Sequence, residues 1–494
     1  MAAVSIVKHL RNYASAGALS AIVGLVSFPI LTRNLSVADY GIVGLITSSI
    51  TFFIAVGKLG VQHAVIRFFA QIRHGNIDFS VAQMNSTVSA VFFVLASCAT
   101  GLWLVTGLLV LPAILQYENI ASLFLLASAI VFIRLIGSGV MNFLRAQQRS
   151  ADVAIAQSLS RFLNVTLIVC VLFFAKLDPW AVIACLMCAE LVGISYAAYQ
   201  YRGDFHFSVP TISGRLAKAM LLYGMPLMIL ESLGLVLRLS DRYLIESMLG
   251  VAQLGQYSAS YNLTAYIDII IIAALIQTLK PAYMQLWESG GKIDTQKFLS
   301  EGFHLYAVIG MPFIAMFALT SPHLLNILAG SKYSPGTVII PYVAVSFWME
   351  GAMHFLAAGL YIFKNTKVLM IWSLVATVTN LVLNFLLIPH YGITGAAVVT
   401  IISYSVFMTG VTILAFRHVE FNLVSRSAVI MLIASVLMFL ALNNLATGSD
   451  LADFLVKGFT GTIGLLLLLW WVDPAVRIWA RTRYAQLAQR GKLS

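Results

Sequence analysis

The sequence predicts an all-α protein that crosses a membrane about fourteen times. Hydrophobic residues make up 60% of its 494 positions and charged residues only 10%, whereas an ordinary soluble domain carries about 25% charged residues. Long apolar segments follow one another from Tyr13 to Val472. The connections between them are too short to fold as separate domains, so the function has to be sought within the bilayer.

Segment length sets the number of crossings. A helix needs roughly 20 apolar residues to cross a hydrocarbon core of about 30 Å, because unpaired backbone groups cannot face lipid. The first seven segments of this kind lie near Tyr13–Leu31, Tyr40–Val56, Met84–Leu111, Ser122–Met141, Ala154–Ala175, Trp180–Tyr199 and Lys218–Leu237. The second seven lie near Tyr257–Leu279, Phe303–Leu328, Val338–Phe363, Val368–Ile388, Ile393–Phe416, Ala428–Leu445 and Leu455–Val472.

The basic residues give an independent test of this count, because Lys and Arg collect in cytoplasmic loops. With the N-terminus inside, the cytoplasmic segments hold Lys8, Arg11, Arg67, Arg73, Arg145, Arg149, Arg202, Arg215, Lys218, Lys292, Lys297, Lys364, Lys367, Arg417, Arg426, Arg477, Arg481, Arg483, Arg490 and Lys492. The outer loops hold only Arg33, Lys176, Arg238, Arg242, Lys332 and Lys457. We therefore expect both termini in the cytoplasm and an even number of helices, which fourteen satisfies and thirteen does not.

The net charge of +11 is spread over many short loops and forms no basic face on a soluble domain. This distribution argues against a nucleic-acid partner and for membrane topology. The tail from Arg477 to Lys492 could still attract anionic lipid. No cleavable leader is evident, so the N-terminal segment is expected to be retained. The four cysteines fall inside predicted helices, no metal site is expected, and no cofactor is implied.

Two short motifs recur at nearly the same offset. LSVADYG at Leu35–Gly41 is followed 214 residues later by LGVAQLG at Leu249–Gly255, and NVTL at Asn164–Leu167 is followed 216 residues later by NLVL at Asn380–Leu383. This spacing predicts a parallel duplication of six helices. The expected domains are 1–205, 206–420, and two appended helices with a basic tail at 421–494. Chance similarity of apolar, glycine-rich strings is the alternative.

Three longer stretches resemble a known family. They are SFPILTRNLSVADYGIVGL at Ser27–Leu45, LSDRYLIESMLGVAQLGQYSASYNL at Leu239–Leu263, and NLVLNFLLIPHYGITGAAVVT at Asn380–Thr400. The chain resembles the polysaccharide or O-antigen flippases (Wzx type) of the multidrug, oligosaccharidyl-lipid and polysaccharide exporter superfamily. The resemblance implies two six-helix lobes around a central cavity that opens alternately to each side of the bacterial inner membrane.

The same resemblance implies the substrate and the partners. The substrate would be an undecaprenyl-diphosphate-linked oligosaccharide, exported for O-antigen or exopolysaccharide synthesis, with its lipid tail left among the membrane lipids. A polysaccharide polymerase and a chain-length regulator are the protein partners that it suggests. No nucleotide-binding motif is present, but a negative cell interior drives an anionic headgroup outward by about 2.3 kcal/mol per charge per 100 mV.

Cations within the helices are candidates for binding the diphosphate, because a charge at bilayer depth is costly unless it faces a cavity or a partner. Arginine suits this task, since its planar donors can grip two phosphate oxygens. The candidates are Arg134, Arg161, Arg238, Arg242, Lys58 and Arg67. The structural alternatives are a buried ion pair with Glu190 for the first two, a helix-end ion pair for Arg242, and snorkelling for Lys58 and Arg67.

Acidic and aromatic residues supply the other candidates. Tyr257, Tyr261, Thr264 and Asp268 recur at spacings of four, three and four, which predicts one polar stripe along a helix. Glu350, His354 and Tyr361 form a second stripe. We expect Tyr257, Tyr261, Thr264 and Tyr361 to line the cavity. Glu231, Asp268, Glu350 and His354 are the candidates for proton or ion coupling. Hydrogen bonding between helices is the structural alternative for both stripes.

Three other functions compete with this interpretation. Cation-coupled export of small organic cations, by the multidrug branch of the superfamily, is disfavoured by the arginines. Lipid II flippases carry an arginine in their first helix. The first segment here departs from that pattern, since it has no cation between Asn12 and Thr32, and this disfavours a lipid II flippase. A membrane polymerase or ligase is disfavoured because no outer connection carries paired carboxylates or a nucleophile. The sequence therefore predicts a transporter and not an enzyme.

Overall fold

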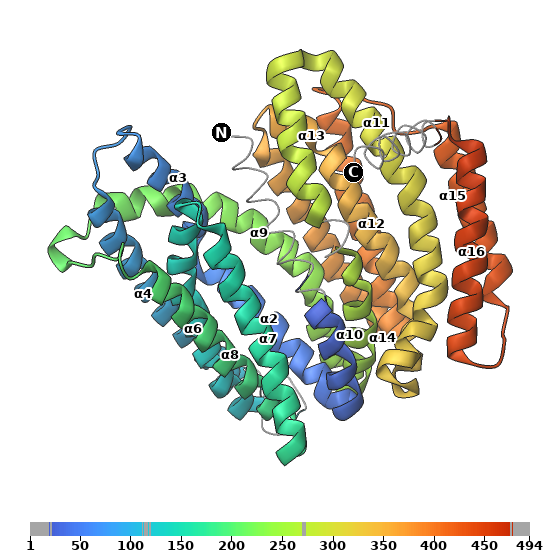
Figure 1. Cartoon of the computed structure of the whole chain (residues 1–494), viewed down its shortest axis with the longest axis horizontal. Coiled ribbons are helices and arrows are strands. Elements are labelled where there is room, and N and C mark those ends of the chain that lie inside the picture. Colours follow the sequence, from blue (N-terminus) through green and yellow to red (C-terminus); the bar gives the residue numbers. More distant parts are fainter. Residues whose placement is uncertain are drawn as a thin grey trace, which may run out of the picture. The chain divides into compact units, whose positions relative to one another are not determined.

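The computed structural model describes residues 19, 22–110, 112, 117, 120–268, 273–474 and 477. Within these ranges the chain forms helices, turns and loops, and no strand. Figure 1 shows long helices throughout, coloured along the chain. The beginning of the predicted segment Tyr13–Leu31 and the basic tail beyond Arg477 lie outside the described residues.

The chain divides into two compact units, and each unit packs mainly within itself. One contains Met1–Ala259 and Ser373–Ser403, and the other contains Ser260–Trp372 and Tyr404–Ser494. The predicted boundaries at residues 205 and 420 stay a prediction. The elements of the first half of the chain are α2 (Val37–Gly57), α3 (Val61–Arg73), α4 (Val81–Val105), η1 (Thr106–Val110), α6 (Ile120–Ala146), α7 (Ser150–Phe174), α8 (Pro179–Tyr201), η2 (Val209–Thr211), α9 (Gly214–Leu249) and α10 (Val251–Thr264).

The remaining elements include two very long helices. They are α11 (Ala273–Ala329), η4 (Ser331–Ile339), α12 (Ile340–Leu356), α13 (Ala358–Ile362), α14 (Thr366–Ala415), α15 (Arg426–Asn443) and α16 (Asp450–Val472). Among the described residues, eleven helices are long and apolar enough to cross a membrane. Two of them bend sharply, α11 at Gly291 and α14 at Gly392, where φ is 69° and 59°. Each therefore carries parts of two predicted crossings. The all-α polytopic fold is confirmed, and its spans are consistent with about fourteen crossings.

The first unit packs tightly where the repeated motif occurs. Gly41 and Gly255 are the last residues of the two motif copies, and they lie against each other at the starts of α2 and α10. A Cβ added to Gly41 would come within 2.8 Å of the Gly255 nitrogen, and one added to Gly255 would come within 1.9 Å of the Val37 carbonyl oxygen. Only glycine allows the two backbones to approach so closely. Equivalent residues of the two copies thus meet, as expected of repeats related by a two-fold axis.

Charged side chains hold α16 to α11 within the second unit. Near one end of α16, His304 Nε2 lies 2.7 Å from Asp473 Oδ2. Near the other end, His323 Nδ1 lies 2.9 Å from Asp450 Oδ1, and Lys457 Nζ lies 3.0 Å from His323 Nε2. Asp473 and Lys457 are almost fully buried. Because Asp473 and Lys457 each have a polar partner, these contacts hold α16 against α11.

Candidate functional site: a cationic pocket in the first unit

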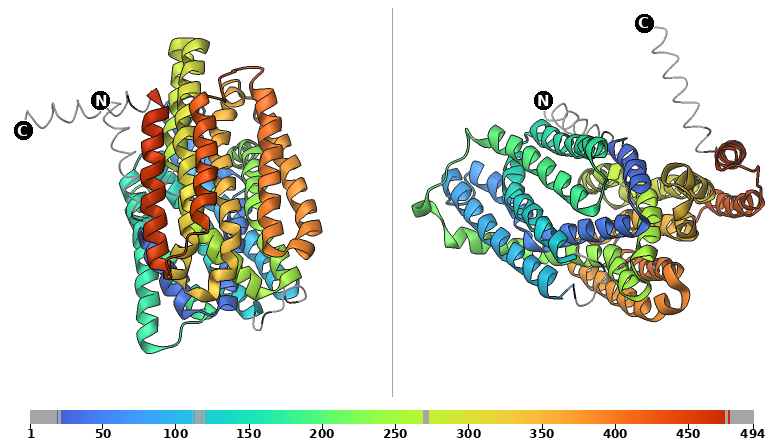
Figure 2. Two further views of the ribbon diagram at one scale, coloured as in Figure 1. Left: turned by 90° about the vertical axis from the view of Figure 1, so that its right-hand side faces the viewer. Right: turned by 90° about the horizontal axis from the view of Figure 1, so that it is seen from below.

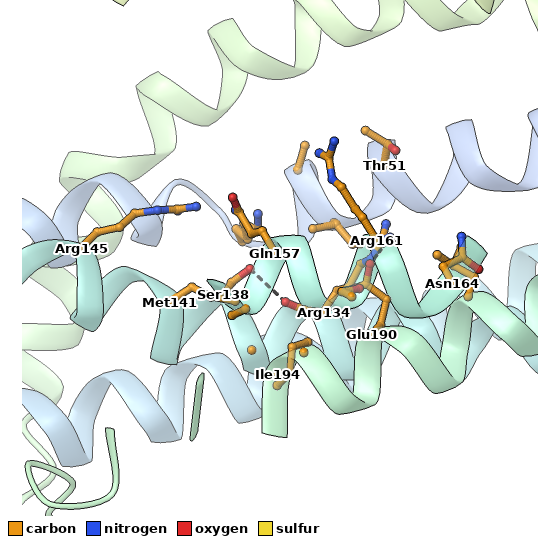
Figure 3. A pocket seen from close by; sticks show the side chains of 18 of the residues that line it. Thr51, Arg134, Ser138, Met141, Arg145, Gln157, Arg161, Asn164, Glu190 and Ile194 are labelled. Atoms are coloured by element: carbon orange, nitrogen blue, oxygen red, sulfur yellow. Dashed lines mark hydrogen bonds and ion pairs between the residues drawn. The ribbon is translucent and has the colours of Figure 1, made fainter. Parts of the chain in front are cut away.

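A pocket of about 500 Å³ lies between α2, α6, α7, α8 and α9. All of its lining residues belong to the first unit. Figure 3 shows the pocket from close by, with Arg145 at one end and Asn164 at the other. The charged residues that line it are Lys58, Arg134, Arg145, Arg161, Glu190 and Glu231. The described lining thus carries two more positive than negative side chains.

An ion pair crosses the pocket wall between α6 and α8. Arg134 Nη2 donates to Glu190 Oε1 over 2.6 Å. The exposed fractions of the two side chains are 28% and 19%, so both keep access to the pocket. The pair joins the middle of α6 to the middle of α8, far from the ends of both helices. Arg134 thus pairs with Glu190, the partner that the sequence suggested. Both residues also line the pocket.

Arg161 comes from the neighbouring helix α7. Its side chain extends into the pocket toward Thr51 (Figure 3). No ion pair to Arg161 occurs among the described residues. A guanidinium at this depth without a carboxylate partner is expensive in a membrane unless an anion or water solvates it. Lys58 and Arg145 also form no ion pair in the described part of the chain, but they are less exposed than Arg161, which is thus the pocket cation most accessible to an anionic ligand.

Lys58 reaches the pocket from the C-terminal end of α2, on the same helical face as Thr51, Ile54 and Ala55. The turn that follows places Leu59 and Gly60 in the left-handed region, with φ of 44° and 73°, before α3 begins. Gly60 is required here, since a Cβ would lie 2.0 Å from the Gly224 carbonyl oxygen of α9. The break therefore turns the chain into α3 directly after Lys58.

Glu231 on α9 also lines the pocket. Its Oε2 accepts a hydrogen bond from Gln62 Nε2 over 3.0 Å and lies 3.5 Å from His63 Nε2. These contacts join α9 to the start of α3. Of the predicted coupling residues, Glu231 is the one that lines the cationic pocket; Asp268, Glu350 and His354 belong to the second unit.

The other predicted cations lie outside this pocket. The Arg67 guanidinium is 4.4 Å from the centre of the Tyr223 ring, a cation–π contact between α3 and α9. Arg238 lies on α9 and is not part of the pocket lining. Arg242 is 6% exposed and donates to the Ser48 hydroxyl and, over 3.3 Å, to the Gly44 carbonyl oxygen. These contacts favour a packing role for Arg242 between α9 and α2.

The stripe from Tyr257 to Asp268 is mostly packed. Tyr257 is fully buried and its hydroxyl donates to Asp241, which is 2% exposed. Tyr261 is 8% exposed, and its ring centre lies 5.7 Å from that of Phe347. Thr264 is buried and donates to the Ser260 carbonyl oxygen over 2.8 Å. Their lining of a wetted cavity stays a prediction, while the contacts match the alternative of hydrogen bonding and packing between helices.

The second unit holds a smaller polar group around α12. Glu350 Oε2 accepts from the Tyr404 hydroxyl over 3.1 Å. Lys280 Nζ lies 3.9 Å from the centre of the Tyr361 ring. His354 follows Glu350 by one turn of α12. Sequence reasoning missed Lys280, although a lysine inside an apolar segment is itself a signal. It also missed the pocket role of Arg145, which the sequence places at a helix end.

Comparison with known proteins identifies the family to which the chain belongs. A family model described as "Polysaccharide biosynthesis protein" matches residues 7–287, which include every residue of the cationic pocket. The succinoglycan biosynthesis transport protein ExoT of Rhizobium meliloti (strain 1021) is 24% identical over 65% of this chain and 62% of its own length. The capsular polysaccharide biosynthesis protein CapF of Staphylococcus aureus is 23% identical over 54% and 63%. The chain thus spans less than two thirds of either relative.

Solved structures share the fold at low sequence identity. The lipid II flippase MurJ in an inward closed conformation matches with a TM-score of 0.75 and 12% identity, over 93% of this chain and 98% of that one. A multidrug resistance MATE family transporter in an inward-facing conformation matches with a TM-score of 0.60 and 14% identity, over 88% and 96%. The fold is therefore that of membrane transporters, and the match over residues 7–287 shows that the chain belongs to the polysaccharide biosynthesis protein family.

Proposed function

We propose that this protein is a flippase that moves an undecaprenyl-diphosphate-linked oligosaccharide outward across the bacterial inner membrane. The observation that carries the proposal is the pocket with an excess of two positive charges inside a transporter fold. Membership of a family whose relatives include a succinoglycan transport protein and a capsular polysaccharide protein supports the saccharide part. Both termini would lie in the cytoplasm, as the distribution of basic residues predicts.

The pocket charge selects for an anion. An excess of two positive charges in a low-dielectric setting attracts a diphosphate far more strongly than it would in water. Arg134 and Arg161 project from two neighbouring helices, so two phosphate groups could be held at once by bidentate contacts. The ion pair with Glu190 holds Arg134 in place before the substrate arrives. A phosphate oxygen would then replace the Glu190 carboxylate as the partner of Arg134. Lys58 and Arg145 would extend the attraction toward the cytoplasmic entrance.

The pocket volume fits a headgroup and not a whole substrate. About 500 Å³ falls within the usual range for small-molecule sites. The diphosphate and the first sugar would occupy it, while the polyprenyl chain stays in the bilayer. The membrane potential would then drive the anionic headgroup outward during alternating access. Proton antiport through Glu231 or Glu350 would add to this driving force. No covalent chemistry is required of the protein, so we do not propose an enzyme.

Export of small organic cations is the second candidate, favoured by the fold shared with multidrug transporters. The pocket argues against it, because a positive lining repels a cationic drug. A lipid II flippase is the third candidate, and the TM-score of 0.75 with MurJ is a specific observation in its favour. At 12% identity this likeness shows the fold and leaves the attached saccharide open.

Reconstitution in liposomes would test the proposal. The purified protein should move a fluorescent undecaprenyl-diphosphate oligosaccharide into a protected compartment. Arg134→Ala and Arg161→Ala should each slow this movement by about tenfold or more, because a hydrogen bond to a charged group is worth about 1.5–3 kcal/mol. Arg73→Gln is the matched control, since it removes a basic residue that does not line the pocket.

Each outcome has a clear meaning. Slow movement in the pocket variants together with normal movement in the control would support the proposal. Efflux of a small organic cation by folded wild-type protein, without movement of the lipid-linked oligosaccharide, would overturn it in favour of drug export. Equal movement of lipid II and of the oligosaccharide would overturn the assignment to polysaccharide synthesis.

A further inference from the structure

A second pocket lies on α4, α6 and α8, away from the cationic one. It measures about 320 Å³ and is lined almost entirely by apolar side chains. Its base is formed by buried residues, among them Val88, Phe92 and Phe143. Gly139 keeps it open, because a Cβ at this position would come within 3.1 Å of the Phe92 ring. Figures 1 and 2 show these three helices side by side.

The groove runs along the last turns of α6 and α8. Its lining begins near the C-terminal ends of these helices, at Phe143 and Arg202, and continues to Phe93 on α4 and Ile136 on α6. Ile136 lies seven residues before Phe143, which is about 10 Å at 1.5 Å per residue. One leaflet of a hydrocarbon core is about 15 Å deep. The groove can therefore accept about two thirds of an acyl chain of one leaflet.

A single cation stands at the mouth of the groove. Arg202 lines the groove and caps α8, just past the apolar span Pro179–Tyr201. Its guanidinium lies 3.8 Å from the centre of the Tyr199 ring, and that tyrosine is 56% exposed. The nearby carboxylate of Asp204 is directed elsewhere, to Arg149 Nη1 at 3.5 Å. The charge of Arg202 thus remains available at the level of the lipid headgroups.

Hydrogen bonds tie the loop around the mouth to α4. The Asn85 side-chain amide donates to the Asp204 carbonyl oxygen over 2.8 Å, and the Tyr201 hydroxyl donates to Asn85 Oδ1 over 2.5 Å. Phe205, 47% exposed, follows and lines the groove. An exposed aromatic ring beside an arginine is typical of the membrane–water interface. The backbone of the mouth is therefore held in place by contacts within the protein, beside an aromatic ring and an arginine.

We infer that this groove is a binding site for one anionic glycerophospholipid, whose acyl chain lies along α4, α6 and α8 and whose phosphate is held by Arg202. The apolar walls match the chain, the groove is deep enough for about two thirds of one leaflet, and the sign of the charge at the mouth matches the headgroup. An uncharged or zwitterionic lipid fits the walls equally well but gains less from the arginine. This site is separate from the cationic pocket and does not depend on the transport function.

Native mass spectrometry of the full-length protein in mild detergent would test the inference. Phosphatidylglycerol and phosphatidylcholine with identical chains are the two probes. Wild type should retain phosphatidylglycerol about fivefold better, as expected for one arginine at an anionic membrane surface. Arg202→Gln should abolish this preference. Ala198→Trp, at an exposed position of the groove wall, should reduce retention of both lipids.

Arg215→Gln is the matched control, since it removes a nearby basic residue that does not line the groove. It should leave the preference unchanged. A preserved preference in Arg202→Gln, or unchanged retention in Ala198→Trp, would overturn the inference. Equal loss of both lipids in Arg202→Gln would also overturn it, because the arginine would then shape the groove without selecting a headgroup. Elution as a single folded species confirms that each variant is comparable.

Discussion

The two halves of the chain carry different charges at corresponding places. In the first half, Arg134 on α6 pairs with Glu190 on α8 over 2.6 Å. In the second half, Glu350 on α12 pairs with Tyr404 on α14 over 3.1 Å. Glu350 follows Arg134 by 216 residues and Tyr404 follows Glu190 by 214, the same two offsets that relate the repeated motifs. The corresponding positions thus make a polar contact between two helices in both halves, an arginine–glutamate ion pair in the first and a tyrosine–glutamate hydrogen bond in the second.

A duplicated scaffold can in this way divide two tasks. A basic position next to an open pocket suits an anionic headgroup, whereas an acidic position beside a histidine suits proton exchange. The contacts of His304 and His323 on α11 with Asp473, Asp450 and Lys457 provide a third case, in which charged groups are paired and hold two helices together. Of these three groups, the pair of Arg134 and Glu190 is the one that lines a described pocket.

Reversing the charge in the first half should have the largest effect. Arg134→Glu places a carboxylate beside Glu190, and the two negative charges would repel the diphosphate. We expect translocation of the lipid-linked oligosaccharide in liposomes to fall by about a hundredfold or more. The double variant Arg134→Glu, Glu190→Arg restores the pair and should recover part of the rate. No recovery in a well-folded double variant would argue against the pair as the headgroup site.

Neutralising Glu350 in the second half should have a smaller effect on transport, and it should act on proton coupling. Glu350→Gln keeps the hydrogen bond from Tyr404 but cannot release a proton. We expect transport to become independent of an imposed proton gradient and to slow by about tenfold in its presence, while headgroup binding is unchanged. Stopped-flow measurement in liposomes with and without the gradient checks this. A variant that responds to the gradient like wild type would remove Glu350 from the coupling mechanism.

Removing the acidic partner in the first half should affect ligand binding more than folding. Glu190→Gln leaves Arg134 with a neutral partner, so the pocket becomes more positive. Binding of a soluble prenyl diphosphate should tighten by about fivefold, roughly 1 kcal/mol. Its release, and therefore turnover, should slow by a similar factor. Isothermal titration calorimetry gives the first value; weaker binding would mean that Glu190 orients Arg134 and does not compete with the ligand.

A change in the packed region between the motif copies should have the smallest effect on transport. Gly41→Ala forces a Cβ to within 2.8 Å of the Gly255 nitrogen. We expect the free energy of unfolding to fall by about 1–3 kcal/mol, as for other overpacked sites. Transport per folded molecule should stay within about twofold of wild type. Gly101→Ala is the control, because its Cβ would meet nothing within 4 Å and should leave thermal unfolding in detergent almost unchanged.

Much of the fold could be predicted from the sequence because the bilayer imposes a strong rule. Backbone groups must pair within each span, so apolar length alone locates the helices. The partner of Arg134, Glu190, was also accessible, since a costly buried cation requires a nearby carboxylate. The connections at Gly291 and Gly392, predicted as loops between separate spans, are sharp bends within α11 and α14 in the structure.

The rotation of each helix could not be predicted. Spacing placed Tyr257, Tyr261 and Thr264 on one stripe, but packing decides whether that stripe faces water or a neighbour. The structure buries all three. Contacts such as His304 with Asp473 join residues 169 positions apart, and no periodicity in one sequence connects them. The chain breaks at Leu59 and Gly60, directly after Lys58, in a local conformation that hydrophobic patterns do not encode.

The contact between Gly41 and Gly255 also bears on ancestry. A residue that touches its own counterpart across a two-fold axis is what a homodimer of a half-length chain would make. In such an ancestor a single substitution would have altered both copies at once. Fusion of the two copies into one chain would have allowed one half to keep an arginine where the other acquired a glutamate. Asymmetry of charge would then be a consequence of joining the copies end to end.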